Sequence, residues 1–314
     1  MNGIELSRAY FEEYGRPLLE RDFASALPFL AAGFTGSGSE HYGFDDETSR
    51  DHDFEPGFII FLPGEDVIDR RTEFLLERAY AKLPREFDGV KRLTVNPVGG
   101  RRSGVIRTAD FYKRAAGTEN GELSVPAWLN IPDYALSEAV NGELFFDNYG
   151  QVTAIRERLS AMPRDVLYKR LAGNLLIMAQ AGQYNFTRCL CHGEYDAAQL
   201  AANEFVTAAI KCAFLLCGKY MPFYKWSFRA LRELPYPEKL SSLLSYILKG
   251  DNADKKTAES KYDAIEEVAA MITGELITLD MTDAICGDLE KHAYSVNDKI
   301  EDGNIRNLNV LSAV

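Results

Sequence analysis

Two aspartates in the N-terminal half of the chain, Asp51 and Asp53, are separated by a single residue. If the chain is extended here, side chains point alternately to opposite faces, so both carboxylates share one face while His52 and Phe54 share the other. Two carboxylates side by side repel each other and need a cation. A hard divalent ion with oxygen ligands is the natural one. The pair therefore predicts a metal site.

A run of glycine and serine lies shortly before this pair, at Gly36, Ser37, Gly38 and Ser39. A turn of such small residues leaves backbone N–H groups uncovered, which suits a bound phosphate, especially where a helix starts. The run contains two Gly-Ser pairs, and the sequence does not choose between them. A metal site and a phosphate site so close along the chain indicate metal–nucleotide chemistry.

The acidic residues around the pair have simpler explanations. The whole run can be a solvated acidic loop that binds nothing, and this alternative stays open. A calcium-binding loop that begins at Asp51 is excluded, because Pro56 stands where the sharp-turn glycine belongs and Leu62 where a bidentate glutamate belongs. We interpret Asp45 to Glu47 as a connector rather than as ligands.

The elements that must position these residues are short strands and helices. Apolar runs bounded by glycine, proline and polar turns predict strands, and apolar residues at helical spacing predict helices. The expected strands are 29–34, 58–62 as the continuation of a strand begun near residue 52, and 143–147; the expected helices are 4–14, 18–27, 69–83 and one that follows Pro132.

Beyond about Gln151 the pattern becomes almost wholly helical, with expected helices at 163–180, 197–216, 222–233, 237–248 and 255–276. We therefore expect an α+β protein of two domains. Residues 1–155 would form a mixed sheet with flanking helices, and residues 156–314 an all-α helical bundle. A chain of 314 residues is long enough for both.

The composition limits the classes of partner that the protein can bind and the cellular compartment in which we expect it. The formal net charge of −12 argues against a general nucleic-acid or anionic-membrane binder, which would need a basic surface. The five cysteines are odd in number, no apolar signal segment precedes them, and no run approaches the roughly 20 apolar residues of a membrane span. We expect a cytoplasmic protein with no membrane partner. The sequence leaves its oligomeric state open.

The Gly-Ser run followed by Asp51-His52-Asp53-Phe54 resembles the signature of the DNA-polymerase-β-like nucleotidyltransferase superfamily, a Gly-Ser turn followed by Asp-x-Asp on the next strand. More closely, GSGSEHYGFDDETSRDHDF, Ile131-Pro132-Asp133-Tyr134 and Asn141-Gly142-Glu143-Leu144-Phe145-Phe146-Asp147 resemble a bacterial family of unknown function. That family is classed with the minimal nucleotidyltransferases and carries an appended helical domain. The architecture is also similar to antibiotic nucleotidyltransferases of the kanamycin and lincosamide type. The resemblance covers the N-terminal half and continues more loosely through residues 220–226.

The resemblance implies roles for the motif residues. Asp51 and Asp53 would hold Mg²⁺ that bridges the phosphates of a nucleoside triphosphate. Ser37 or Ser39, with the neighbouring amides of Gly36 and Gly38, would bind the β- and γ-phosphates.

Two further assignments lie later in the chain. A third carboxylate from a later strand completes such sites, and Glu143 and Asp147 are the candidates, because they share a face if 143–147 stays extended; Asp147 is preferred. In the helical half, Lys225 could bind the triphosphate, and its aromatic neighbours could stack a base. The alternative is that those aromatics belong to the core and Lys225 is solvated.

The function that the resemblance implies is a Mg²⁺-dependent nucleotidyltransferase. It would transfer a nucleoside monophosphate, AMP from ATP in most such proteins, to a hydroxyl of an unidentified small molecule or protein. The first alternative is a catalytically silent nucleotide-binding or regulatory protein on the same fold. The second is an interaction protein whose helical half is an assembly surface. The sequence identifies neither the acceptor nor the nucleobase.

Overall fold

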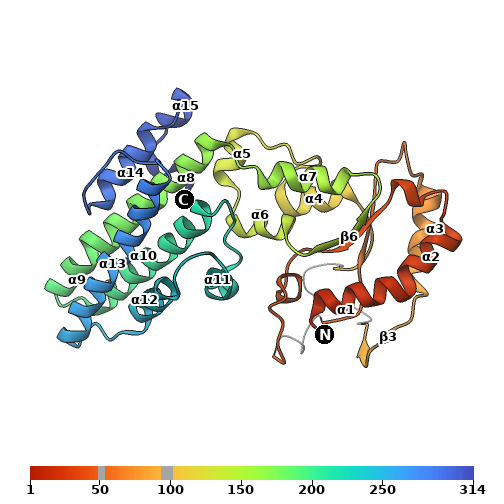
Figure 1. The fold of residues 1–314 in the computed structure, drawn as a ribbon, viewed down its shortest axis with the longest axis horizontal. Helices are drawn as coiled ribbons and strands as arrows, with labels where there is room; N and C mark the ends of the chain where they lie inside the picture. The colour runs from red at the N-terminus through yellow and green to blue at the C-terminus, as the bar shows by residue number, and fades with distance from the viewer. Residues whose placement is uncertain (49–53, 93–101) are drawn as a thin grey trace. The chain divides into compact units, whose positions relative to one another are not determined.

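The computed structural model describes residues 1–48, 54–92 and 102–314 (Figure 1). The chain divides into two compact units, the first with residues 1–123 and 135–161 and the second with residues 124–134 and 162–314. A single division after residue 155, as expected from the sequence, differs from this arrangement at 124–134 and at 156–161. The larger difference is the segment 124–134. That segment carries helix α5 (Val125–Asn130), which packs against α8 (Arg164–Met178) of the second unit.

The first unit is built on a four-stranded mixed sheet in the order β5-β2-β1-β6. The strands are β1 (Ala31–Phe34), β2 (Ile59–Leu62), β5 (Gly104–Arg107) and β6 (Glu143–Asp147). β1 runs antiparallel to both β2 and β6, whereas β2 and β5 are parallel. Strands β3 (Glu86–Phe87) and β4 (Val90–Lys91) form a separate two-stranded sheet. With the helical second unit, this confirms the α+β prediction.

Helices cover both faces of the two central strands. Ala32 and Ile60 pair across β1 and β2 and belong to one core with Phe11 and Leu76, which come from the helices on that face. On the opposite face, Phe61 meets Phe111, with ring centroids 5.2 Å apart. A strand covered on both faces needs a continuous apolar run rather than an alternating one. This is why FIIFL predicts a buried strand from sequence.

The helices of this unit are α1 (Gly3–Tyr10), α2 (Arg16–Asp22), α3 (Arg70–Ala81), α4 (Thr108–Ala116), the greater part of α6 (Asp133–Val140), and α7 (Gln151–Ser160). A π-helical turn, Phe11–Gly15, joins α1 to α2, so the two predicted N-terminal helices form one helical run. The run starts at a capping box of Asn2 and Glu5. It ends at Asp22, which makes the predicted extension to residue 27 wrong.

β2 is shorter than predicted. Residues 54–58 are described and do not form a strand, so the strand begins at Ile59 and does not continue one begun near residue 52. Pro56 supplies the physical reason, because proline has no N–H to donate to a central strand. The Asp-x-Asp pair is therefore separated from β2 by an irregular segment.

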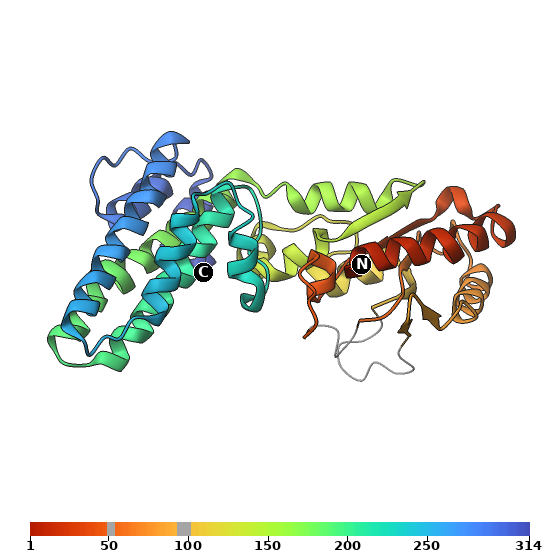
Figure 2. The same ribbon diagram turned by 60° about the horizontal axis from the view of Figure 1, so that its bottom comes forward.

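The second unit is helical, and the five long helices expected from sequence are confirmed. Besides α5 and α8 it contains α9 (Thr187–Cys191), α10 (Tyr195–Leu216), α11 (Tyr224–Leu231), α12 (Glu238–Lys249), α13 (Lys255–Thr278), α14 (Leu289–Asp298) and α15 (Gly303–Arg306). A π-helical segment, Ala179–Phe186, joins α8 to α9. Figure 2 shows the long helices alongside one another, with α10 packed against α8 and α13, and α14 against α8.

Helix α10 is the one helix of the described residues that is long and apolar enough to cross a membrane by length and composition. Of its most apolar window, 56% is buried inside the protein. Ala198, Ala202, Phe205 and Ala209 are fully buried at helical spacing along it. This is the burial pattern of a core helix that packs against neighbours along its length.

A buried lysine ties a loop to the helices of the second unit. Lys261 of α13 is 0% exposed, and its Nζ donates to Gln199 Oε1 at 2.9 Å, to the Gly250 carbonyl at 3.0 Å and to Asn252 Oδ1. None of these acceptors is charged. Burial therefore lowers the pKa of Lys261 from 10.5 to about 8.

This pKa sets a pH dependence of stability. Between about pH 8 and pH 10.5 the unfolded chain keeps the Lys261 proton that the folded chain releases, so the free energy of unfolding rises with pH in this window. Each pKa unit corresponds to about 1.4 kcal/mol, so wild type should gain up to about 3 kcal/mol relative to Lys261→Met across it. Urea denaturation at intervals from pH 7 to pH 10.5 measures the difference.

The matched control is Lys255→Met, on the same helix but with a side chain that is 91% exposed. Its free energy of unfolding should follow that of wild type at every pH. A constant difference between wild type and Lys261→Met from pH 8 to pH 10.5 would contradict the buried, uncompensated charge.

Candidate functional site

One end of the four-stranded sheet gathers four chain segments that lie far apart in sequence. β1 leaves the sheet there after Phe34, which pairs with Glu143 at the start of β6. Gly33 pairs with Ile59 at the start of β2, and Ile59 pairs with Gly104 at the start of β5. The Gly-Ser run that follows β1 therefore meets the segments that lead into β2, β5 and β6. We call this end the turn end of the sheet.

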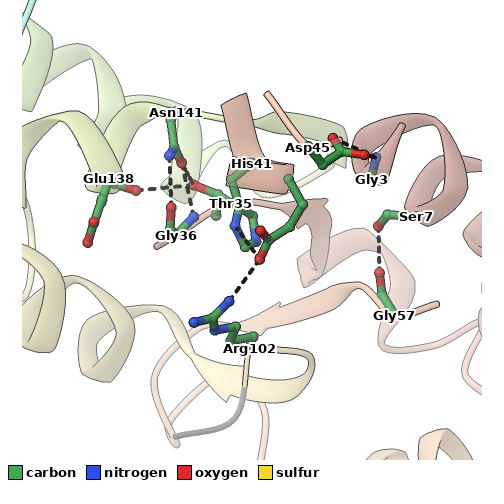
Figure 3. A network of polar contacts seen from close by, with 11 residues as sticks. Gly3, Ser7, Thr35, Gly36, His41, Asp45, Gly57, Arg102, Glu138 and Asn141 are labelled. Carbon is green, nitrogen blue, oxygen red and sulfur yellow. Dashed lines mark hydrogen bonds and ion pairs between the residues drawn. The ribbon is translucent and has the colours of Figure 1, made fainter. Parts of the chain in front are cut away.

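The side chain of Asn141 holds the backbone at the start of the Gly-Ser run. Its Oδ1 accepts a hydrogen bond from the Gly36 N–H at 3.0 Å, and its Nδ2 donates to the Gly36 carbonyl at 2.8 Å. The same Oδ1 accepts from the Thr35 hydroxyl at 3.0 Å. Figure 3 shows the amide facing both residues. The side chain thus extends the pairing of β1 to Gly36, two residues beyond the strand, in place of a strand partner.

Two other residues, Gly142 and Arg156, help to hold Asn141 in this position. Gly142 has φ +65°, and a side chain there would collide with the Phe34 carbonyl oxygen, so only glycine permits this approach. Arg156 of α7 donates from Nη2 to Thr35 Oγ1 at 3.1 Å and to the backbone carbonyl of Asn141. Within the described residues no carboxylate is paired with Arg156, and burial lowers its pKa. Its positive charge lies close to the turn.

The turn presents backbone donors. Ser37 is exposed, whereas Ser39 is buried at the start of a short 3₁₀ segment. Gly38 has φ +122° and ψ +154°, which is essentially restricted to glycine, and a side chain there would collide with the Glu40 carboxylate. The N–H groups of Ser37, Gly38 and Ser39 donate to no other described residue. An exposed hydroxyl beside open N–H groups favours Gly36-Ser37 as the phosphate-facing pair.

A buried ion pair lies behind the turn. Glu40 is 7% exposed, and its Oε1 accepts a hydrogen bond from Arg102 Nη1 at 2.9 Å. His41 is buried beside it and stacks on Phe34, with ring centroids 4.1 Å apart. Burial, and then the charge of Arg102, lowers the pKa of His41 to about 3, so the ring is neutral at physiological pH. Arg102 is therefore the cation that balances Glu40; Figure 3 shows it with His41 and the Gly36 backbone.

The two candidate third carboxylates lie on opposite faces of β6. Glu143 pairs with Phe34 and Asp147 with Ala31, and the register shifts between them so that Phe145 is an extra residue. Phe34 and Ala31 point to opposite faces of β1, and paired residues point to the same face. The expectation that Glu143 and Asp147 share a face is wrong, because a β-bulge interrupts the alternation.

Each of these carboxylates has a structural partner. Glu143 forms an ion pair with Arg8 of α1, in which Nε and Oε2 are 3.1 Å apart. Asp147 lies at the end of β6 away from the turn end, where its oxygens accept from the N–H groups of Gly150 at 2.8 Å and Thr153 at 2.7 Å. An acid there caps α7 and meets the positive end of its dipole. The register brings Glu143 to the Gly-Ser run and leaves Asp147 remote from it.

The described contacts do not test the remaining predicted residues. Asp51 and Asp53 lie outside the described residues, so their role as metal ligands stays a prediction. Lys225 belongs to the second unit, in the first turn of α11, where it is exposed and its Nζ lies 5.0 Å from the centroid of the Trp226 ring. Its role in nucleotide binding also stays a prediction.

Asn141, Arg102 and Arg156 are not identified as site residues by the sequence. The Asn141-Gly142 pair predicts a turn, as Asn-Gly pairs usually do. That the Asn141 side chain also binds the Gly36 backbone cannot be predicted until its partner is known. The two arginines carry no local signal, because Arg102 binds a residue 62 positions away and Arg156 one 121 positions away.

Comparison with known proteins gives two matches. Residues 128–227 match a family model described as a domain of unknown function (DUF4037). The crystal structure of a nucleotidyltransferase-like protein from Exiguobacterium sibiricum 255-15 matches with 11% identity and a TM-score of 0.37, over 85% of this chain and 76% of that chain. At that identity and TM-score the neighbour's name does not assign an activity here. No curated protein matches, and the expected similarity to kanamycin- and lincosamide-type enzymes stays a prediction.

The clamp on Gly36 predicts a measurable loss of stability. Asn141→Ala removes every bond to the Gly36 backbone made by this side chain and leaves buried Thr35 without its amide partner, so the first unit should lose about 1–3 kcal/mol. Far-UV circular dichroism during urea denaturation measures the loss. Trp128 and Trp226 both lie in the second unit, so their fluorescence reports on that unit in the same titration.

The control is Asn148→Ala, which removes one exposed hydrogen bond, from Nδ2 to the Leu27 carbonyl at 2.9 Å. It should cost less than the Asn141 substitution. Equal losses for the two variants would show that Asn141 does not hold the turn.

The cap on α7 makes a separate prediction for Asp147. Asp147→Ala should destabilise the first unit by about 0.5–2 kcal/mol, since both backbone N–H groups lose their acceptor. Asp147→Asn keeps an oxygen acceptor and should lose less. Thermal unfolding followed by circular dichroism compares the two, and an Asn variant as unstable as the Ala variant would contradict the capping role.

Proposed function

We propose that this protein is a Mg²⁺-dependent nucleotidyltransferase that transfers a nucleoside monophosphate, AMP from ATP, to a hydroxyl of a small molecule or protein. The observation that carries the proposal is the Gly-Ser turn at the turn end of the sheet. The N–H groups of Ser37, Gly38 and Ser39 donate to no other residue that the structure describes, and the Gly36 backbone is held by Asn141. The chain that follows Asp51-His52-Asp53 enters β2 at that same end.

The turn supports phosphate binding for electrostatic reasons as well as geometric ones. Successive backbone N–H groups in a turn make a concave site with partial positive charge. Ser37 adds an exposed hydroxyl donor, and Arg156 adds a full positive charge behind Thr35. A phosphate seated there would meet N–H donors without displacing the Asn141 clamp, whose bonds are made to Gly36 alone among the turn residues.

In this proposal Asp51 and Asp53 hold the metal. Mg²⁺ supplies charge stabilisation for the phosphates during in-line displacement. The acceptor hydroxyl oxygen forms a bond to the α-phosphorus, the bond from that phosphorus to the bridging oxygen breaks, pyrophosphate leaves, and the hydroxyl proton is released to solvent. The turn residues Gly36 to Ser39 orient the β- and γ-phosphates so that the leaving group lies in line.

The third carboxylate is not part of the proposal. Glu143 is paired with Arg8 on the α1 face, and Asp147 caps α7 at the other end of the strand. Within the described residues, no group of three or more His, Cys, Asp or Glu side chains is placed to hold a metal ion.

The test is label transfer from α-labelled ATP with Mg²⁺ to a panel of small hydroxyl acceptors and to cell-extract proteins. Wild type should transfer label, and Asp51→Ala with Asp53→Ala should reduce the rate by at least about 100-fold, because metal charge stabilisation contributes several kcal/mol. Asp46→Ala with Glu47→Ala removes two charges from the same acidic run and should leave transfer intact.

The outcomes separate the alternatives. Label transfer that survives loss of Asp51 and Asp53 would overturn the assignment. Tight ATP binding by calorimetry without transfer to any acceptor would favour the catalytically silent nucleotide-binding alternative. Asp147→Asn should transfer label at the wild-type rate, and a loss of transfer without a loss of stability would restore Asp147 as a catalytic carboxylate.

A further inference from the structure

Three aromatic side chains of the second unit are exposed and in contact with one another. Tyr134, in the first turn of α6, and Phe223, directly before α11, lie edge to face with ring centroids 5.7 Å apart. Phe223 also contacts Tyr224, with ring centroids 4.4 Å apart. Their exposed fractions are 42%, 42% and 74%. We call these three residues the ring cluster. Phe223 and Tyr224, which precede Lys225, therefore do not belong to the core.

A buried ion pair fixes the segment that carries Tyr134. The side chains of Asp133 and Arg170 of α8 are 8% and 6% exposed, and Oδ1 and Nη1 lie 3.4 Å apart. Arg170 Nη2 also donates to the Ile131 carbonyl at 2.6 Å. One arginine thus holds the chain on both sides of Pro132, directly before Tyr134. Rings on a backbone that is already fixed lose less entropy when a ligand binds.

The chain around the ring cluster is basic, although the protein is acidic. Residues 205–232 contain no aspartate or glutamate and five cations, in a chain with a formal net charge of −12; the cations are Lys211, Lys219, Lys225, Arg229 and Arg232. Lys225 directly follows Tyr224 and is exposed. Lys225 and Arg229 are four residues apart on α11 and so share a face of that helix. The charge in this region favours an anionic ligand.

Exposed rings with a cation beside them suit a ligand that has a planar ring and an anionic group. Aromatic side chains stack on the face of any nucleobase. The rings of the cluster are inclined to each other by 85° and 46°, so they are not stacked flat on one another and ring faces stay open to a planar ligand. A protein or lipid partner needs apolar area of any kind, whereas the exposed side chains in contact here are all aromatic. A nucleotide combines the required ring and charge.

We propose that the second unit carries a nucleotide-binding site of its own, in which the ring cluster stacks the base and Lys225 binds the phosphate. The site needs no metal ion and no residue of the first unit. It therefore goes beyond the transfer reaction proposed above and does not depend on the Gly-Ser turn.

The test is calorimetric titration of the full chain with AMP and with adenosine in EDTA, where a Mg²⁺-dependent site does not bind. Wild type should bind both. Tyr224→Ala should weaken both ligands by the same factor, roughly 5- to 100-fold, because it removes a stacking ring. Lys225→Met should weaken AMP roughly two- to fivefold and leave adenosine unchanged, since AMP alone carries the charge. Added salt should reduce that difference.

Two control variants isolate the ring cluster. Tyr224→Phe keeps the ring and should bind as wild type does. Tyr184→Ala removes another exposed tyrosine of the second unit, whose ring centroid lies 4.9 Å from the Arg188 guanidinium carbon. It should also bind as wild type does, which separates the cluster from an exposed aromatic–cation pair elsewhere. Far-UV circular dichroism and the urea midpoint verify folding of each variant.

The outcomes distinguish this site from the proposed function. Equal AMP affinity in wild type and Tyr224→Ala, or no AMP binding to wild type in EDTA, overturns the site and leaves the transferase assignment standing. A single-stranded RNA oligonucleotide that binds through Tyr224 at least about 100-fold more tightly than AMP also overturns it, because the surface is then a nucleic-acid interface. Tyr224-dependent AMP binding in a protein that transfers no label supports the site and overturns the transferase assignment.

Discussion

The pairing of the Asn141 side chain with the Gly36 backbone is the interaction on which the candidate site depends. β1 is held between two antiparallel neighbours as far as Phe34, and beyond it no strand of the described residues supplies partners. Left unpaired, the Gly36 N–H and carbonyl would need other partners, and the glycine is free to adopt many conformations. One primary amide satisfies both groups and fixes where the following N–H groups point. The turn is therefore ordered by a side chain rather than by its own sequence.

The sheet shows which structural features sequence patterns can predict and which they cannot. Apolar runs with turn residues at each end predict β1, β2 and β6, because central strands covered on both faces must be apolar throughout. The faces of β6 are not predictable in the same way. Phe145 and Phe146 are both apolar and both lie near Phe11, with ring centroids 5.2 and 5.7 Å apart, so nothing in their types marks the bulge. The bulge follows from pairing with β1, and it alone decides that Glu143 and Asp147 face opposite ways.

The helical unit was predictable for a different reason. Apolar periodicity and a proline just before or within the first turn identify α8, α12 and their neighbours locally, since most of the information for an amphipathic helix lies within its own span. The features of this unit that local sequence does not predict are those that depend on contacts with distant segments. Lys261 resembles any solvated lysine in sequence, yet it is buried because Gln199 and the 250–252 loop offer it oxygen atoms. The segment 124–134 joins this unit for the same reason, through packing of α5 on α8.

The same distinction applies to the chemistry of the site. A short motif identifies the backbone shape, because glycine is needed where φ is positive and small side chains leave N–H groups open. The charge around that backbone comes from residues that the motif does not contain. Arg8, Arg102 and Arg156 reach the turn end from α1, the segment before β5 and α7, against Glu40 and Glu143. A chain with a formal net charge of −12 can therefore still place three arginines at one end of a sheet, and the potential at an anion site depends on such groups within a few ångströms rather than on the sum over the chain.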